Sequence, residues 1–149
     1  MRGLLLGTDA LQAFLADDAT LHGWLSTQVL PLHAATVSIA SLLASAEQMT
    51  NVTQRRLWSE KLGDEVPRRF GPKLQAFDLA AAKVWSALYV EMVAASAGTE
   101  ATLIPEGELF VIAIAMAEDL DYIEARADWH GAISGLRQFD PWSSSRFPA

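Results

Sequence analysis

Short continuous apolar runs along the chain alternate with segments whose apolar residues recur at helical spacing. Runs of the first kind predict buried strands, and segments of the second kind predict helices with one face toward a core. Strands are expected at residues 3–6, 29–36, 74–77, 121–125 and 135–139. Helices are expected behind Thr8 and Asp9, at 19–28, at 37–49, between residue 53 and Pro67, from Asp78 to Gly98, and at 108–118 behind Pro105. Strands and helices therefore alternate along nearly the whole chain.

This alternation predicts one α/β domain in which helices cover both faces of a parallel sheet of four to five strands, giving three layers. Residues 1–142 are expected to form the domain, and residues 143–149 a flexible tail. Trp142, just before the tail, is expected to pack back on the domain. In such a sheet the functional crevice lies at the carboxyl ends of the strands. Candidate site positions are therefore Gly7 to Asp9, Ser38 to Ser41 and Glu108.

Composition agrees with a single globular unit, because 51% of the 149 residues are hydrophobic and 19% are charged. The absence of cysteine excludes disulfides and thiolate metal sites and fits a reducing cytoplasm. The longest apolar run, residues 109–117, is about half of the roughly 20 residues that a membrane helix needs. Residues 1–6 are too short for the apolar region of a secretory signal. We therefore expect a cytoplasmic protein with no membrane segment.

The formal net charge of −7 argues against strong binding to a nucleic-acid backbone, which depends on Lys and Arg. The basic residues nevertheless crowd the stretch from Arg55 to Lys73. This stretch is either a local positive face that contacts RNA or a solvated helix in which Arg56 and Glu60 pair across one turn, and the sequence leaves both interpretations open.

Five segments in this order resemble the PIN-domain family of VapC-type toxins. They are residues 5–11 (LLGTDAL), 37–43 (VSIASLL), 77–82 (FDLAAA), 108–117 (ELFVIAIAMA) and 135–142 (GLRQFDPW). The resemblance covers residues 4–142. It implies the three-layer PIN-like fold, a cytoplasmic toxin–antitoxin or plasmid-stability protein, a homodimer, and a small antitoxin-type partner. It also implies Mg²⁺ or Mn²⁺ held by a cluster of carboxylates, with water activated to cut RNA.

Carried over by position, the resemblance gives an incomplete set of metal ligands. The first family aspartate falls on Gly7, and the family glutamate falls on Ser41, so both carboxylates are lost. Glu108 retains the third acid, and Asp128 is the candidate for the fourth. Asp9 lies near the lost first ligand and offers a substitute carboxylate. Thr8 and Ser38 are expected to support this site.

Each of these acids also has a simpler interpretation. Asp9 is favoured as a helix cap, Glu108 is explained as a first-turn acid, and Asp128 as a loop residue. The three histidines, which are far apart in sequence, are expected to be surface or packing residues; they are His22, His33 and His130. The leading hypothesis is a PIN-like protein with an eroded ribonuclease site and weak or absent metal binding, which acts through protein or RNA binding. The alternative is an active Mg²⁺- or Mn²⁺-dependent endoribonuclease in which Glu108, Asp128 and Asp9 hold the metal.

Overall fold

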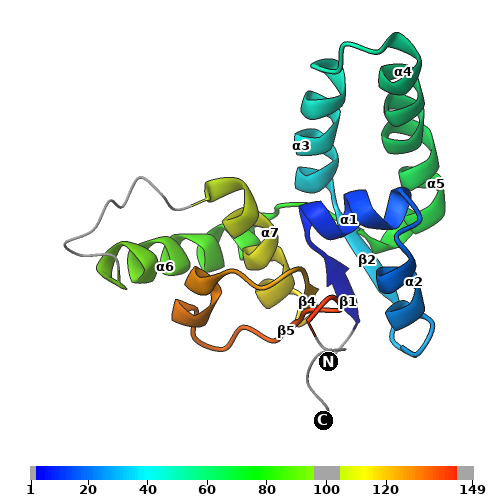
Figure 1. The fold of residues 1–149 in the computed structure, drawn as a ribbon. Helices are drawn as coiled ribbons and strands as arrows, with labels where there is room; N and C mark the ends of the chain where they lie inside the picture. Colours follow the sequence, from blue (N-terminus) through cyan, green and yellow to red (C-terminus); the bar gives the residue numbers. More distant parts are fainter. Residues whose placement is uncertain (1–2, 96–104, 144–149) are drawn as a thin grey trace.

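The computed structural model describes residues 3–95 and 105–143, which form a sheet with helices on both faces (Figure 1). Its strands are β1 (Leu4–Leu6), β2 (Leu32–Ala35), β3 (Leu74–Gln75), β4 (Asp121–Ile123) and β5 (Gln138–Phe139). Its α-helices are α1 (Thr8–Leu15), α2 (Ala19–Leu25), α3 (Thr36–Glu47), α4 (Val52–Glu60), α5 (Val66–Phe70), α6 (Leu79–Ala95) and α7 (Glu106–Ala117). A π-helical turn (Lys61–Glu65) joins α4 to α5, and 3₁₀ turns cover Gly71–Lys73 and Asp128–Ala132.

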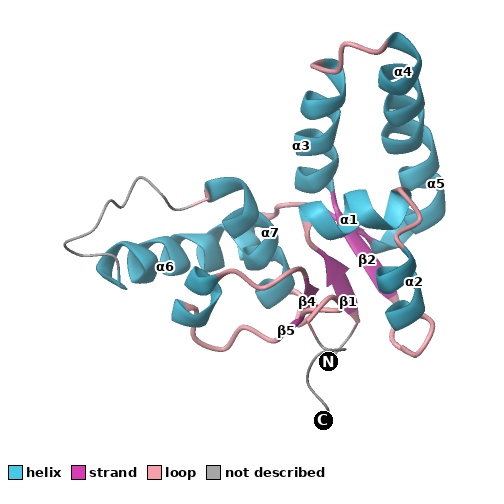
Figure 2. Cartoon of the chain, in the orientation of Figure 1, coloured by secondary structure: helices cyan, strands magenta, loops and turns pink. Residues whose placement is uncertain are grey.

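All five strands are parallel, in the order β3-β2-β1-β4-β5 (Figure 2). The chain builds outward from β1 through β2 to β3, and then returns to place β4 on the other side of β1. The direction of winding therefore reverses between β1 and β4. In open α/β sheets this reversal opens a crevice at the carboxyl ends of the two strands.

The alternation of side chains along the strands divides the core into two halves. Leu5 and Tyr122 point to the face that α6 and α7 cover, and the core on that side also holds the apolar residues of α7. Leu4, Leu6 and Ile123 point to the opposite face, where they pack with α1, α2 and α5. Successive residues of a strand face opposite sides, so the three leucines of β1 contribute side chains to both halves of the core. The three-layer α/β fold predicted from the sequence is confirmed. Figure 1 shows α3, α4 and α5 on one arm and α6 and α7 on another, with the sheet between them.

Two segments differ from their predicted form. The strand expected from Val29 begins only at Leu32; Pro31 has no N–H to donate to a sheet, and Val29 is 97% exposed. Pro67 does not end its helix, because it lies in the first turn of α5, where a missing N–H is tolerated. That helix ends instead at Gly71, whose φ of 52° is readily adopted by glycine.

The C-terminal segment is anchored to the N-terminal half of the chain. Trp142 packs against the core on the α1 and α2 side, in agreement with the prediction that it packs back on the domain. Its Nε1 donates a hydrogen bond to Asp18 Oδ2 over 3.1 Å. Asp18 also caps α2 by accepting from the Leu21 N–H. Of the predicted tail only Ser143 is described, and it hydrogen-bonds to Asp140; the remainder, and the predicted helix end at Gly98, lie outside the described residues. Within the described ranges, no helix has the length and apolar character to cross a bilayer.

Candidate functional site

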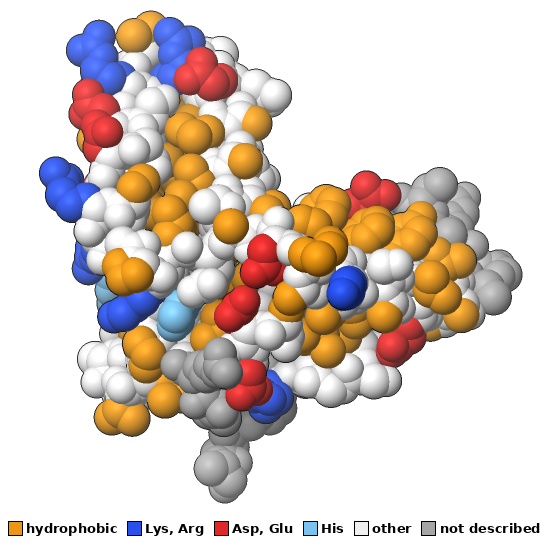
Figure 3. Space-filling view, turned by 180° about the vertical axis from the view of Figure 1, so that it is seen from behind, with side chains coloured by type: hydrophobic (Ala, Val, Ile, Leu, Met, Phe, Trp, Pro, Cys, Tyr) orange, Lys and Arg blue, Asp and Glu red, His pale blue; other side chains and the backbone are white. Residues whose placement is uncertain are grey.

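A small cavity of about 160 Å³ lies at the carboxyl ends of the strands, beside the point where the winding reverses. Four segments that are distant in sequence contribute to its lining, which consists of Thr8, Asp9, Val37, Ser41, Gly107, Glu108 and Glu124. Figure 3 shows acidic side chains in the angle between the two helical arms. The cavity therefore includes two of the three predicted carboxylates, Asp9 and Glu108, together with an acid that the sequence did not single out.

The N-terminus of α1 forms one wall of this cavity and corrects the prediction for Asp9. The N-cap position is occupied by Gly7, and Asp9 is an exposed residue of the first turn, so it does not cap the helix. The acceptor is instead the side chain of Glu124, the residue that follows β4. Glu124 Oε2 accepts hydrogen bonds from the backbone N–H of Asp9 over 3.0 Å and of Ala10 over 3.3 Å. The cap missed by the sequence is thus a carboxylate from the neighbouring strand.

The Glu124 carboxylate is almost fully enclosed. The residue is 4% exposed, and its second oxygen, Oε1, accepts from the Ala125 N–H over 3.0 Å. Loss of hydration raises the pKa of Glu124 to about 7, and the negative charge of Asp9 adds to this rise, although the backbone N–H donors oppose it. Behind it, the buried Tyr122 hydroxyl has no hydrogen-bond partner of good geometry, and burial raises its pKa. The site therefore holds a buried acid whose pKa lies well above that of an ordinary carboxyl group.

Glu108, in the first turn of α7, is hydrogen-bonded to the buried imidazole of His130. The other ring nitrogen, Nδ1, accepts from the Ala127 N–H over 3.0 Å and faces the Gln138 amide at 3.1 Å. Because Nδ1 accepts, Nε2 carries a proton and donates it to the Glu108 carboxylate. The expectation that the histidines only pack or face solvent was therefore incomplete for His130, whose Nε2 donates a hydrogen bond to Glu108.

The remaining predicted residues differ in their positions. Ser41 is exposed but lines the cavity, and Thr8 and the buried Ser38 hydrogen-bond to each other through their hydroxyls over 2.9 Å. Asp128 is an exposed residue that opens a 3₁₀ turn, and it does not line the cavity. In residues 3–95 and 105–143, no three His, Asp or Glu side chains lie close enough together to hold a metal ion.

The sequence contained a signal for one of the two missed residues. Glu124 directly follows β4, as Gly7 directly follows the neighbouring strand β1, and an acid in that position is conspicuous once the parallel pairing of β1 and β4 is known. His130 had no such signal. Its contact with Glu108 joins residues 22 positions apart through a loop whose path the apolar pattern does not define.

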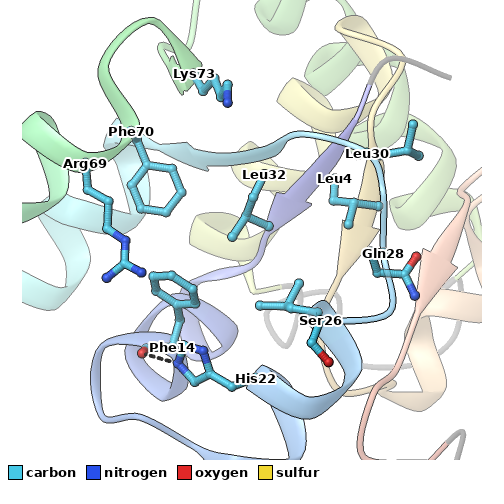
Figure 4. Close-up of a pocket in the computed structure, with 11 residues that line it drawn as sticks. Leu4, Phe14, His22, Ser26, Gln28, Leu30, Leu32, Arg69, Phe70 and Lys73 are labelled. Carbon is cyan, nitrogen blue, oxygen red and sulfur yellow. Dashed lines mark hydrogen bonds between the residues drawn. The ribbon is translucent and has the colours of Figure 1, made fainter.

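A second, larger cavity of about 460 Å³ lies between α1, α2 and α5, near the start of β1 and β2 (Figure 4). Its floor is apolar and includes Leu4, Leu32 and Phe70. Its rim is basic, because Arg69 and Lys73 both line it. The Arg69 guanidinium lies 4.7 Å from the centre of the Phe14 ring, a cation–π distance. Neither cation forms an ion pair within the described part of the chain.

No protein-family model matches the sequence, and no curated protein matches it significantly. Solved structures do match. A chain of FitAcB from Neisseria gonorrhoeae superposes with a TM-score of 0.75 at 19% identity, covering 93% of this chain and 98% of that one. A chain of DNA-bound VapBC from Salmonella typhimurium gives 0.69 at 16% identity, covering 95% and 99%. A chain of VapBC-5 from Mycobacterium tuberculosis, a member of the VapBC family of toxin-antitoxin systems, gives 0.61 at 17% identity, covering 93% and 97%. The fold is that of the PIN domains.

Proposed function

We propose that this chain is a protein of the toxin–antitoxin type that acts by binding a small partner protein, with a ribonuclease site that is eroded. The observation that carries the proposal is that the two buried or half-buried carboxylates of the small cavity are already engaged by donors of the protein itself. Among the structures that share its fold, VapBC-5 is described as a member of a family of toxin-antitoxin systems.

A divalent metal does not fit the residues of this cavity. Mg²⁺ takes oxygen ligands and is usually held through one or two protein carboxylates together with water, so the lone pairs of those carboxylates must be free to face the ion. Gly7 offers no side chain, and Ser41 offers a neutral hydroxyl. Glu124 points its oxygens at three backbone N–H groups, and Glu108 is paired with His130. We therefore derive no metal-dependent step, and the proposed activity rests on binding.

The larger cavity supplies the surface for the partner. The cavity has an apolar floor and room for a few side chains, and its two rim cations have no acidic partner among the described residues. It therefore fits a segment that carries apolar residues beside Asp or Glu. The chain as a whole has a net charge of −7 and would repel such a segment, so these cations direct it to this place. The same net charge disfavours RNA as the main ligand.

A homodimer, which the sequence resemblance implies, has a candidate surface on α6. Leu79 is 71% exposed and Val90 is 66% exposed on this helix, and exposed apolar residues that form a contiguous patch mark sites of protein interaction. Figure 3 shows broad hydrophobic surface on the arm that contains α6 and α7.

The proposal is tested by searching for a short reading frame beside the gene and expressing the chain together with its product. We expect a defined complex by size-exclusion chromatography with light scattering, and no RNA cleavage by the isolated chain in Mg²⁺ or Mn²⁺. Arg69→Glu combined with Lys73→Glu should weaken the complex at least tenfold, whereas the exposed control Arg56→Glu, outside the cavity, should not. A complex insensitive to both cavity charges would contradict the assignment of the surface.

An active Mg²⁺- or Mn²⁺-dependent endoribonuclease is the second candidate, because Asp9, Glu108 and Glu124 line one cavity. It requires that a metal displace His130 and the backbone donors from the two glutamates. Calorimetric titration with Mn²⁺ separates the two candidates: binding in the micromolar range, with RNA cleavage that Glu108→Ala abolishes, would establish the enzyme. Loss of cleavage in Asp128→Ala would bring that exposed acid into the site.

A further inference from the structure

The space beside Gly7 is filled by the Glu124 carboxylate. β1 and β4 pair in parallel up to Leu6 and Ile123, and the Gly7 N–H donates to the Ile123 carbonyl over 2.8 Å, so residues 7 and 124 lie next to each other. A Cβ placed on Gly7 would lie 2.3 Å from Glu124 Oε2 and 2.9 Å from the Tyr122 hydroxyl. Both distances are shorter than van der Waals contact allows. A side chain on residue 7 and the observed Glu124 therefore exclude each other.

Space, and not backbone conformation, is what requires glycine at this position. Gly7 has φ of −67° and ψ of 174°, an extended conformation that any residue adopts. This is also the usual conformation of an N-cap residue, for which Asp, Asn, Ser and Thr are preferred because their side chains accept from the second or third N–H of the helix. Gly7 lacks such an acceptor although it occupies the N-cap position of α1.

Glu124 makes the hydrogen bonds that an N-cap side chain would make. The second and third residues of α1 are Asp9 and Ala10, and their N–H groups donate to Glu124 Oε2. A negative charge at this end of a helix is also stabilised by the helix dipole. The acceptor for the N-terminus of α1 has thus been supplied across the sheet, from the end of β4.

We infer that Glu124 is a positioning residue. Its carboxylate fills the space that a side chain on residue 7 would occupy, and it accepts the hydrogen bonds that such a side chain would accept. By holding the first turn of α1 it sets where Thr8 and Asp9 stand on the wall of the small cavity. The inference goes beyond the proposed function and does not depend on it, because it holds whether or not the cavity binds a metal.

A double-mutant cycle tests the inference. Gly7→Asp alone should lower the thermal midpoint by about 5 °C or more because its Cβ meets Glu124. At pH 5, where the buried carboxyl retains its proton, Glu124→Ala alone should lower it by about 5 °C because α1 loses its acceptor. The combination should be more stable than either single variant, since the aspartate then occupies the emptied space and accepts from the same two N–H groups. Gly131→Asp, at a glycine with open space around it, should give no such rescue when combined with Glu124→Ala.

A second measurement follows the helix end itself. Hydrogen exchange at the amides of Asp9 and Ala10 should be at least tenfold faster in Glu124→Ala and return toward the wild-type rate in Gly7→Asp/Glu124→Ala. If Gly7→Asp does not fold, Gly7→Ala presents the same Cβ without a charge. Gly7→Ala/Glu124→Ala should then lose the clash but keep the fast exchange. Additive losses in the cycle, or a Gly7→Asp protein as stable as wild type, would overturn the inference.

Discussion

The buried Glu124 carboxylate predicts that the folded protein loses stability as the pH rises toward neutrality. Its pKa is raised from an ordinary value of 4.5 to about 7 in the folded state. Below pH 4.5 the group is protonated in both the folded and the unfolded chain, so it adds no penalty. Between pH 4.5 and 7 the folded state retains a proton that the unfolded state has released, and stability therefore falls with rising pH. Above pH 7 the full cost of ionising the buried carboxyl is present, about 3 kcal/mol, since a difference of one pKa unit corresponds to about 1.4 kcal/mol.

Glu124→Gln isolates this effect, because glutamine resembles the protonated acid and does not ionise. Urea unfolding of both proteins, followed by tryptophan fluorescence at pH 5, 6, 7 and 8, gives the free energy of unfolding at each pH. The difference between variant and wild type should move in favour of the variant by about 2–3 kcal/mol over this range, whatever its constant offset from the altered hydrogen bonds. The exposed control Glu47→Gln should follow the wild-type curve. A difference that stays constant from pH 5 to 8 would refute the reasoning.

Three further predictions concern other contacts. His130→Ala should lower the free energy of unfolding by about 3 kcal/mol in urea titrations, because it leaves Glu108 without its donor and opens a cavity where a 3% exposed residue stood; a loss below about 1 kcal/mol would show that the pair contributes little. Arg137→Ala should lower the thermal midpoint, because it removes the donor 2.7 Å from the buried Asp121 carboxylate, and adding Asp121→Asn should recover part of the loss; no recovery would mean that the unpaired charge is not the cause. Val90→Lys should shift the chain toward monomer in analytical ultracentrifugation if α6 forms the dimer contact, whereas the control Arg56→Glu, at an exposed residue of α4, should leave the assembly unchanged; an unaltered dimer in Val90→Lys would place the contact elsewhere.

The sequence was sufficient for the fold because the apolar pattern determines it. The strand Leu4–Leu6 is buried on both faces, and parallel strands of this kind consist of nearly continuous apolar residues. Helix α7 was located for the same reason, as an apolar run with Pro105 at its start. Boundaries were less well predicted where single residues decide them, as Pro31 does for β2 and Gly71 does for α5.

The site was only partly predictable, because its decisive contacts join distant segments. Comparison with a family pattern singled out Gly7 as a position without a carboxylate and Glu108 as a retained acid, and Glu108 lines the cavity. It did not show that a neighbouring strand fills the space beside Gly7, since that conclusion requires the β1 and β4 register. Asp9 was interpreted as a cap because only local candidates were considered, and the actual acceptor lies 115 residues away. Tertiary contacts of this kind are invisible to rules that consider one helix at a time.

The crowding between residues 7 and 124 also restricts the order in which two substitutions can enter a lineage. A glutamate at position 124 cannot adopt its observed place while residue 7 carries a Cβ. Glycine at an N-cap, in contrast, costs only a few tenths of a kcal/mol, so glycine at position 7 is the accessible first step. With Glu124 in place, a change at either position alone loses stability, because a Cβ on residue 7 meets the carboxylate and removal of the carboxylate leaves α1 without its acceptor. An acid at position 7 therefore fits this chain only together with a change at position 124.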